Sequence, residues 1–206
     1  MVPIKQQLAN RANYGAKRTQ KIEWIVMHYT ANDGDSDESN GRYFQQALNP
    51  VASAHYFVDD DSITQSVPDD FIAYHCGAVS YRHPVCRNAN SIGIEMCDAK
   101  REGKVMGTDK TLSNAAELVR TLCKKYGVPT DHIITHYDVT GKLCPAYWVG
   151  NGGLAAFRAM VDASDELEQA KKTLMEKAGL AEKTVDYLEA YKWGADLIKK
   201  LAAAMI

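Results

Sequence analysis

Short apolar runs alternate with polar turns through much of the chain, a pattern typical of β-strands. The runs are rich in β-branched residues and cover residues 23–29, 54–59, 63–67, 91–97 and 132–137. The second and third runs flank a polar DDDS turn, which predicts a hairpin. Within SIGIEMC, strict alternation places Ile92, Ile94 and Met96 on one face of a strand and Glu95 on the other.

One amphipathic helix is predicted over residues 111–126. Apolar residues recur there at helical spacing, and Gly127 with Pro129 supplies a stop signal. A further helix is expected from the glycine-rich turn GNGG to about Ala163. Helices interleaved with short strands predict the α/β class, with a mixed central β-sheet flanked by helices.

A change of composition divides the chain near Val161. Residues 1–161 form the predicted main domain, whereas residues 162–206 are enriched in Ala, Lys, Glu and Leu. This second part predicts a small C-terminal helical segment, with helix starts near Ser164 and Glu182.

The apolar stripe of the C-terminal segment includes Tyr187, Tyr191 and Trp193. Three roles fit such a stripe: attachment to another surface, formation of a homo-oligomer, and packing against the main domain. The pattern by itself leaves all three open.

Composition and charge limit the classes of molecule that the protein can be expected to bind. A chain of 206 residues with 46% hydrophobic side chains can bury one domain and a small appendix. The net charge of -2 and the dispersed Lys and Arg residues disfavour a nucleic-acid partner. No stretch approaches a membrane span, and the first twenty residues lack a signal-peptide core, so we expect synthesis in the cytoplasm without membrane insertion.

Three residues are candidate metal ligands: His28, His136 and Cys144. Each histidine ends an apolar run that is predicted as a strand, and the cysteine follows eight residues after the second histidine. Imidazole and thiolate suit Zn²⁺, and three protein ligands leave the fourth tetrahedral position for water. Taken singly, a histidine or cysteine at such a position is more often structural.

Four segments together resemble one enzyme family. IVMHYTAN, SAHYFVD, SIGIEM and THYDVTGKLCP occur in the order and approximate spacing of zinc-dependent N-acetylmuramoyl-L-alanine amidases, a group that includes phage lysins and peptidoglycan recognition proteins. The resemblance covers roughly Lys21 to Phe157. It implies a zinc amidase that cleaves bacterial peptidoglycan between N-acetylmuramic acid and L-alanine.

The resemblance also implies roles for single residues. His28, His136 and Cys144 match the zinc ligands, and Lys142 matches a lysine that stabilises the developing oxyanion. Glu95 matches a glutamate that handles the proton of the attacking water, which other members replace with a tyrosine. Because Ala54 stands at that tyrosine position, the glutamate arrangement is the consistent one.

Further residues in matching segments are ambiguous. His75 and Tyr56 are predicted to bind substrate, although a structural role fits each of them as well. The acidic residues around Asp35 and Asp37 lack the full calcium-loop pattern, so a solvated loop that leads into a helix through Phe44 is the better interpretation.

Two alternatives to a wall-lytic enzyme remain open. One is a non-catalytic peptidoglycan-binding protein on the same scaffold, which the presence of Cys144 and Glu95 disfavours. The other is a cytoplasmic amidase that recycles anhydro-muropeptides. The C-terminal helices favour a phage or prophage endolysin, which would be made in the bacterial cytoplasm and reach the wall after lysis or holin-type release.

Overall fold

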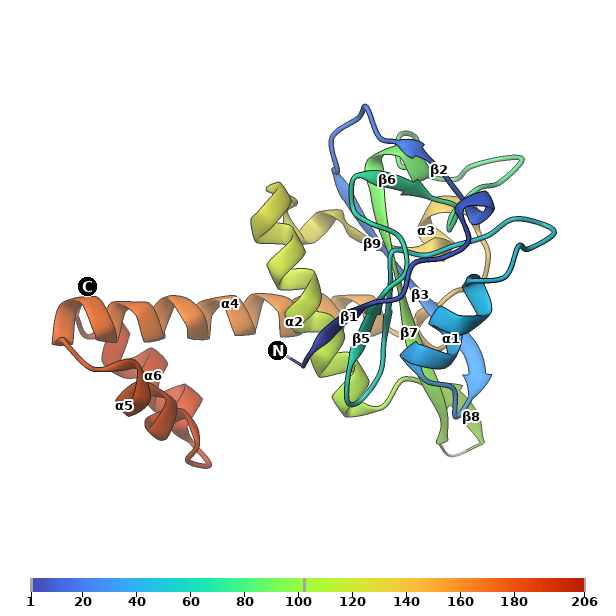
Figure 1. Cartoon of the computed structure of the whole chain (residues 1–206). Coiled ribbons are helices and arrows are strands. Elements are labelled where there is room, and N and C mark those ends of the chain that lie inside the picture. The colour runs from blue at the N-terminus through green and yellow to red at the C-terminus, as the bar shows by residue number, and fades with distance from the viewer. Residues whose placement is uncertain (1, 102, 206) are drawn as a thin grey trace. The chain divides into compact units, whose positions relative to one another are not determined.

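The computed structural model describes residues 2–101 and 103–205, and the chain divides into two compact units, Met1–Arg158 and Ala159–Ile206. The first unit holds a mixed sheet with helices around it, as Figure 1 shows. This confirms the predicted α/β class with a mixed central sheet.

Within the described residues, the main sheet has seven strands, with six in the order β1-β5-β4-β7-β3-β9 and β8 paired to β7. These strands are β1 (Ile4–Gln6), β3 (Trp24–Asp33), β4 (Tyr56–Val58), β5 (Ile63–Gln65), β7 (Ser91–Arg101), β8 (Lys104–Met106) and β9 (Ile133–Thr135). The central strands β4, β7, β3 and β9 are parallel to one another, whereas β4 and β5 form the predicted antiparallel hairpin. A separate small sheet pairs β2 (Tyr14–Lys17) with β6 (Phe71–Ala73).

Helix α2 (Asp109–Tyr126) packs on β7 and β4. Its apolar stripe is buried, and so are Ile92, Ile94 and Met96 of β7, as the strand alternation predicts. Thr108 caps the start by accepting a hydrogen bond from the Thr111 N–H, and the helix ends at Gly127, whose φ of 67° suits glycine. The other face of β7, which carries Glu95, is thereby left for a cleft.

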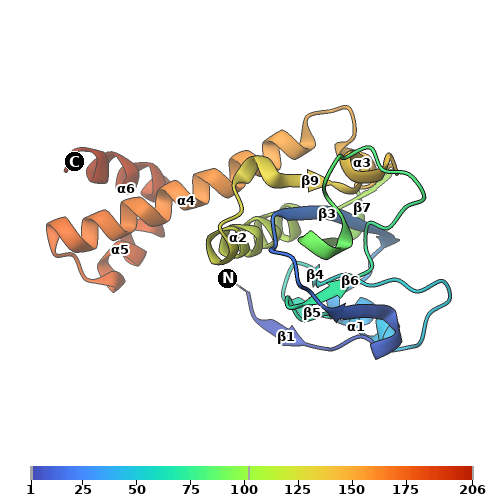
Figure 2. The same cartoon turned by 90° about the horizontal axis from the view of Figure 1, so that it is seen from above.

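Helix α1 (Asp37–Phe44) lies beside β4 and β5, on the other side of the sheet from α2 (Figures 1 and 2). The acidic segment leads into this helix as predicted, but Asp37 is not solvated. The residue is 1% exposed, and its carboxylate accepts hydrogen bonds from Ser62 and Thr64, because α1 packs directly on β5. The short α3 (His136–Thr140) also belongs to this unit.

The C-terminal segment is helical, but its boundaries differ from the prediction. Helix α4 (Gly153–Ala178) continues unbroken past Ser164, because no residue there stops it. Helices α5 (Glu182–Glu189) and α6 (Gly194–Ala203) follow, and the predicted start at Glu182 is confirmed. A small core of Ala170, Leu174, Val185, Ile198 and Ala202 holds this unit together. Across residues 2–101 and 103–205, no helix combines the length and apolar character that crossing a bilayer requires.

Candidate active site

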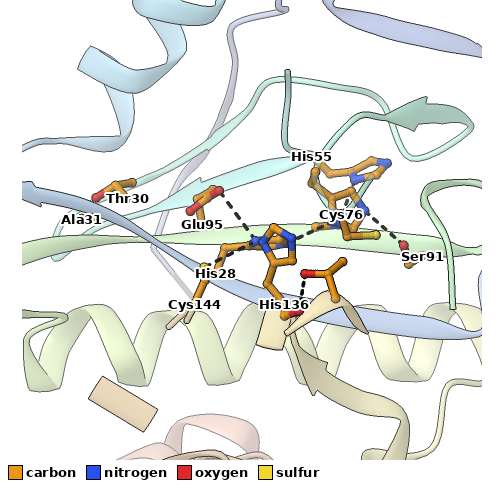
Figure 3. A network of polar contacts seen from close by, with 12 residues as sticks. His28, Thr30, Ala31, His55, Cys76, Ser91, Glu95, His136 and Cys144 are labelled. Carbon is orange, nitrogen blue, oxygen red and sulfur yellow. Dashed lines mark hydrogen bonds and ion pairs between the residues drawn. The ribbon is translucent and has the colours of Figure 1, made fainter. Parts of the chain in front are cut away.

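Parallel pairing of β3 with β7 brings His28 and Glu95 together. The two residues are direct partners in the strand register, and paired residues present their side chains on the same face. The Nδ1 atom of His28 lies 4.0 Å from Oε1 of Glu95. Figure 3 shows both side chains on the same side of the sheet.

The sequence predicts that His136 ends a strand. In the structure, His136 is instead the first residue of α3. The strand β9 stops at Thr135 because this residue caps the helix: its hydroxyl accepts a hydrogen bond from the Asp138 N–H at 3.1 Å, and its own N–H donates to the Asp138 carboxylate at 2.9 Å. Since β9 pairs with β3, His136 arrives beside His28, with 4.7 Å between the ring centroids.

Cys144 completes the group from the loop that follows α3. The carbonyl of Cys144 accepts a hydrogen bond from the Tyr137 N–H at 3.0 Å, which fixes the loop against the helix. The Sγ atom of Cys144 lies 3.7 Å from Nδ1 of His28. The structure therefore brings together all three predicted metal ligands.

The three donors fit a metal ion. Their ligand atoms all lie within 4.8 Å of one another. Tetrahedral coordination with bonds of about 2.0–2.3 Å places neighbouring ligand atoms about 3.3–3.6 Å apart, close to the distance between Cys144 Sγ and His28 Nδ1. The Nδ1 atom of His136 is buried and has no hydrogen-bond partner among the described residues, as expected of a nitrogen that awaits a ligand.

Burial keeps both histidines in the form that binds a metal. Desolvation, reinforced by Lys142, lowers the pKa of His136 to about 4, and desolvation and the neighbouring histidines lower the pKa of His28. Burial raises the pKa of the Cys144 thiol to about 12, so a cation beside it is needed to favour the thiolate at neutral pH. A divalent ion at this centre would supply that charge.

Glu95 is a carboxyl group held in an unusual state. Burial raises its pKa to about 8, and Lys142 opposes this shift. Its Oε2 atom is buried and lacks a hydrogen-bond partner within the described part of the chain. A carboxyl with a pKa near neutrality beside the metal ligands can both accept and return a proton.

Two clefts meet at Lys142. One, of about 660 Å³, is lined by Glu95, Cys144 and residues of α1 and the end of β3. The other, of about 760 Å³, is lined by His75, His136 and the loop around Val79. Because Lys142 lines both, a substrate that spans the two clefts would pass the metal ligands and the lysine ammonium group.

His75 lies behind the metal ligands. Its ring borders the second cleft, but Nδ1 is 3.0 Å from Nε2 of His28 and Nε2 is 3.1 Å from the Ser91 hydroxyl. Both ring nitrogens therefore have protein partners, and the side chain is 9% exposed. The predicted contact between His75 and substrate therefore stays a prediction, and it would use the edge of the ring that borders the second cleft.

Tyr56 points away from the first cleft. In the pairing of β4 with β7, Tyr56 shares the face of Ile94, whereas Phe57 shares the face of Glu95. The Tyr56 hydroxyl donates to the Asp69 carboxylate at 2.6 Å in a buried network. Substrate binding by Tyr56 is thus not supported, and Phe57 lines the cleft in its place.

Asp98 and Ala31 were not predicted from the sequence. Ala31 lines the first cleft with a φ of 59°, and its N–H donates to Asp98 Oδ2 at 2.8 Å. An aspartate that follows the alternating SIGIEMC run and belongs to no motif gives no signal of this role. Only the bulge in the pairing of β3 with β7 brings these two residues together.

Similarity to known proteins covers most of this chain. A family model described as "N-acetylmuramoyl-L-alanine amidase" matches residues 18–147. A probable N-acetylmuramoyl-L-alanine amidase from Bacillus licheniformis is 42% identical over 151 residues, which cover 69% of this chain and 42% of that protein. The amidase CwlL from the same species is 37% identical over 196 residues, covering 89% of this chain and 53% of CwlL.

A solved structure supports the same fold. A mutant endolysin from Bacillus subtilis superimposes with a TM-score of 0.64 at 27% identity, covering 78% of this chain and 99% of that one. By contrast, the chain spans about half the length of the two curated relatives from Bacillus licheniformis.

Proposed function

The chain belongs to the N-acetylmuramoyl-L-alanine amidase family, and on that premise we propose that it hydrolyses the amide bond between N-acetylmuramic acid and L-alanine of bacterial peptidoglycan. We further propose Zn²⁺ as the cofactor, held by His28, His136 and Cys144. The observation that carries this proposal is the convergence of the three donors, with Glu95 4.0 Å from His28 on the same side of the sheet.

Bound Zn²⁺ would polarise the scissile carbonyl and lower the pKa of a water molecule to about 7. Glu95 takes a proton from the attacking water and delivers it to the departing nitrogen of L-alanine. Lys142 places its ammonium group beside the oxyanion that develops on the carbonyl oxygen. The products are a glycan with a free lactyl carboxylate and a stem peptide with a free amino terminus.

Two features oppose the alternative of a non-catalytic peptidoglycan-binding protein. Cys144 supplies the third ligand, and Glu95 has a pKa raised to about 8, which a binding site for neutral glycan does not require. A recycling amidase would have the same chemistry and differ in substrate. The similarity of the fold to that of an endolysin supports action on the intact wall.

We propose residues 1–161 as the catalytic domain and residues 162–206 as a segment for wall attachment. The C-terminal unit exposes Tyr187, Tyr191 and Trp193, three aromatic side chains that could stack on a glycan. Access to the wall would follow cell lysis or holin-type permeabilisation of the membrane.

The test is digestion of purified sacculi with and without a zinc chelator, followed by mass spectrometry of the new chain ends and measurement of bound metal. Free L-alanine amino termini that disappear on chelation and return with Zn²⁺ would support the proposal. Bound Zn²⁺ without cleavage of sacculi, but with cleavage of anhydro-muropeptides, would favour the recycling enzyme. Absence of bound metal would contradict the assigned centre.

A further inference from the structure

We propose that His75 is a positioning residue that decides which nitrogen of His28 binds the metal. The inference rests on the proposed metal site and goes beyond it, because it concerns a residue behind the ligands. It is carried by a chain of four polar groups: the Arg87 carbonyl, the Ser91 hydroxyl, and the rings of His75 and His28. Figure 3 shows the dashed contact of this chain that ends at Ser91.

The Arg87 carbonyl fixes the direction of every hydrogen bond in this series of four groups. The Arg87 carbonyl can only accept, so the Ser91 hydroxyl donates to it across 2.7 Å. With its proton used there, the Ser91 oxygen accepts from Nε2–H of His75 at 3.1 Å. With its ring proton on Nε2, His75 has a bare Nδ1, which accepts from Nε2–H of His28 at 3.0 Å.

The same chain leaves Nδ1 of His28 without a proton. This is the nitrogen that lies 3.7 Å from Cys144 Sγ and 4.0 Å from Glu95. The metal centre therefore receives a lone pair from His28 rather than an N–H. In many metal sites, a carboxylate or carbonyl accepts a hydrogen bond from the other ring nitrogen of a ligating histidine and so orients it. Here the acceptor is the ring of His75.

The fold holds the His75 ring in place from two sides. A side-chain carbon added at Gly93 would lie 2.4 Å from Cγ of His75, so the ring packs on β7 at a position where glycine leaves room for it. The Asn88 side-chain oxygen accepts the His75 N–H at 3.2 Å and the Cys76 N–H at 2.9 Å. These contacts fix the backbone from which the ring projects.

Zinc affinity, measured by competition with a chromophoric chelator, tests the inference without any substrate. His75→Leu removes the acceptor and should weaken Zn²⁺ binding by about 10–100-fold, the usual effect of losing such a partner. His75→Asn keeps an oxygen acceptor near the place of Nδ1 and should retain most of the affinity. His132→Gln is the control, because this ring stacks on Trp24 and contacts the Glu23 carbonyl rather than a metal ligand, and the variant should bind Zn²⁺ as the unchanged protein does.

Ring-nitrogen NMR of the unchanged, metal-free protein gives a second reading that does not depend on how variants fold. His75 and His28 should both carry their proton on Nε2. A proton on Nδ1 of His75, or unchanged Zn²⁺ affinity in folded His75→Leu, would overturn the inference while leaving the proposed amidase intact. Failure of the unchanged protein to bind Zn²⁺ would instead overturn both.

Discussion

Glu95 is placed by strand register and not by an ion pair. Its partner in β7 and β3 pairing is His28, and its raised pKa comes first from burial. Such a carboxyl group can exchange protons readily. Its Oε1 atom lies 4.0 Å from Nδ1 of His28, which is too far for a hydrogen bond. Changing its chemistry should therefore affect turnover more than metal binding.

We expect Glu95→Gln to keep Zn²⁺ affinity while lowering kcat by about two to four orders of magnitude, the usual contribution of a general acid-base group. The amide retains the size of the side chain but cannot accept the proton of water. Turnover of a soluble muramoyl-peptide and metal content would be measured together. Activity close to that of the unchanged enzyme would remove Glu95 from the mechanism.

Lys142→Met should likewise spare the metal while lowering kcat by about 10²–10³-fold, because its charge acts on the oxyanion of the transition state. Lys142 is exposed and lines both clefts, so the fold does not depend on it. Metal content and kcat of the variant are the measurements. Loss of Zn²⁺ in place of lost turnover would show that the lysine acts on the centre itself.

Asp37 should make stability depend on pH. Burial and a hydrogen bond with Asp59 raise its pKa to about 6, so the folded protein holds a proton that the unfolded chain releases near pH 4. Ionising Asp37 therefore costs stability as pH rises through this window. Asp37→Asn can still accept from Thr64 and can donate to Asp59, so it should be about 1 kcal/mol more stable at pH 7.5, or about 2–4 °C in Tm, but not below pH 4.

Thermal unfolding at both pH values checks this prediction. A gain of equal size at pH 4 and pH 7.5 would mean that packing, and not ionisation, sets the difference.

The ligands could be predicted from the sequence because their residue types and motifs are local. The roles of His75, Tyr56 and Asp98 could not, since each depends on a partner that strand pairing supplies. His75 meets His28 from 47 positions away, and Tyr56 turns to Asp69 because β4 exposes alternate residues to opposite faces. Tyr56 and Phe57 are neighbours in β4 and therefore lie on opposite faces of the sheet. A strand of three residues is too short for its sequence to show which residue faces the cleft.

At the scale of elements, the end of β3 forms the rim of the first cleft. The strand shifts register against β7 between Tyr29 and Asp33, and Ala31 adopts a left-handed conformation there. Such a conformation costs roughly 1 kcal/mol in a residue with a side chain. The Asp98 carboxylate offsets this cost by accepting the Ala31 N–H, while the Asp98 N–H donates to Asp35 at 3.1 Å.

We expect Asp98→Ala to raise KM severalfold and to cost about 1–2 kcal/mol of stability, because the Ala31 N–H loses its acceptor. Zn²⁺ affinity should change little, since the Asp98 carboxylate bonds to the Ala31 N–H and the Thr30 hydroxyl of the rim rather than to a ligand atom. Adding Ala31→Gly should recover part of the KM, because glycine adopts this φ without strain. Unchanged KM in the single variant, measured by steady-state kinetics, would show that the rim does not contact substrate.

Helix boundaries show where element prediction succeeds and where it stops. Helix α2 could be predicted because it has a clear stripe and a glycine stop. Helix α4 extends beyond the expected end because its stripe passes from the residues near Phe157 to the core around Leu174 without a break in propensity. The change of composition near Val161 therefore falls inside α4 and does not end the helix.

At the scale of the whole molecule, the chain combines a unit with the metal centre and a helical unit with its own core. The helical unit contains an ion-pair network in which Lys171 contacts Asp186 at 3.3 Å and Glu189 at 2.6 Å. These contacts hold α5 to α4 and leave the aromatic residues outside the core. Exposed aromatic side chains that their own unit does not need are candidates for binding.

Replacing both Tyr191 and Trp193 with alanine should weaken co-sedimentation with sacculi without changing turnover of a soluble muramoyl-peptide. The two side chains are 56% and 71% exposed, so their removal leaves the core around Leu174 intact. Lys183→Ala, at an exposed position of α5, is the matched control and should sediment normally. Light scattering of the same proteins separates the alternatives: a smaller particle in the aromatic variant would assign the two residues to self-association, and equal sedimentation with equal mass would leave wall attachment to another surface of the chain.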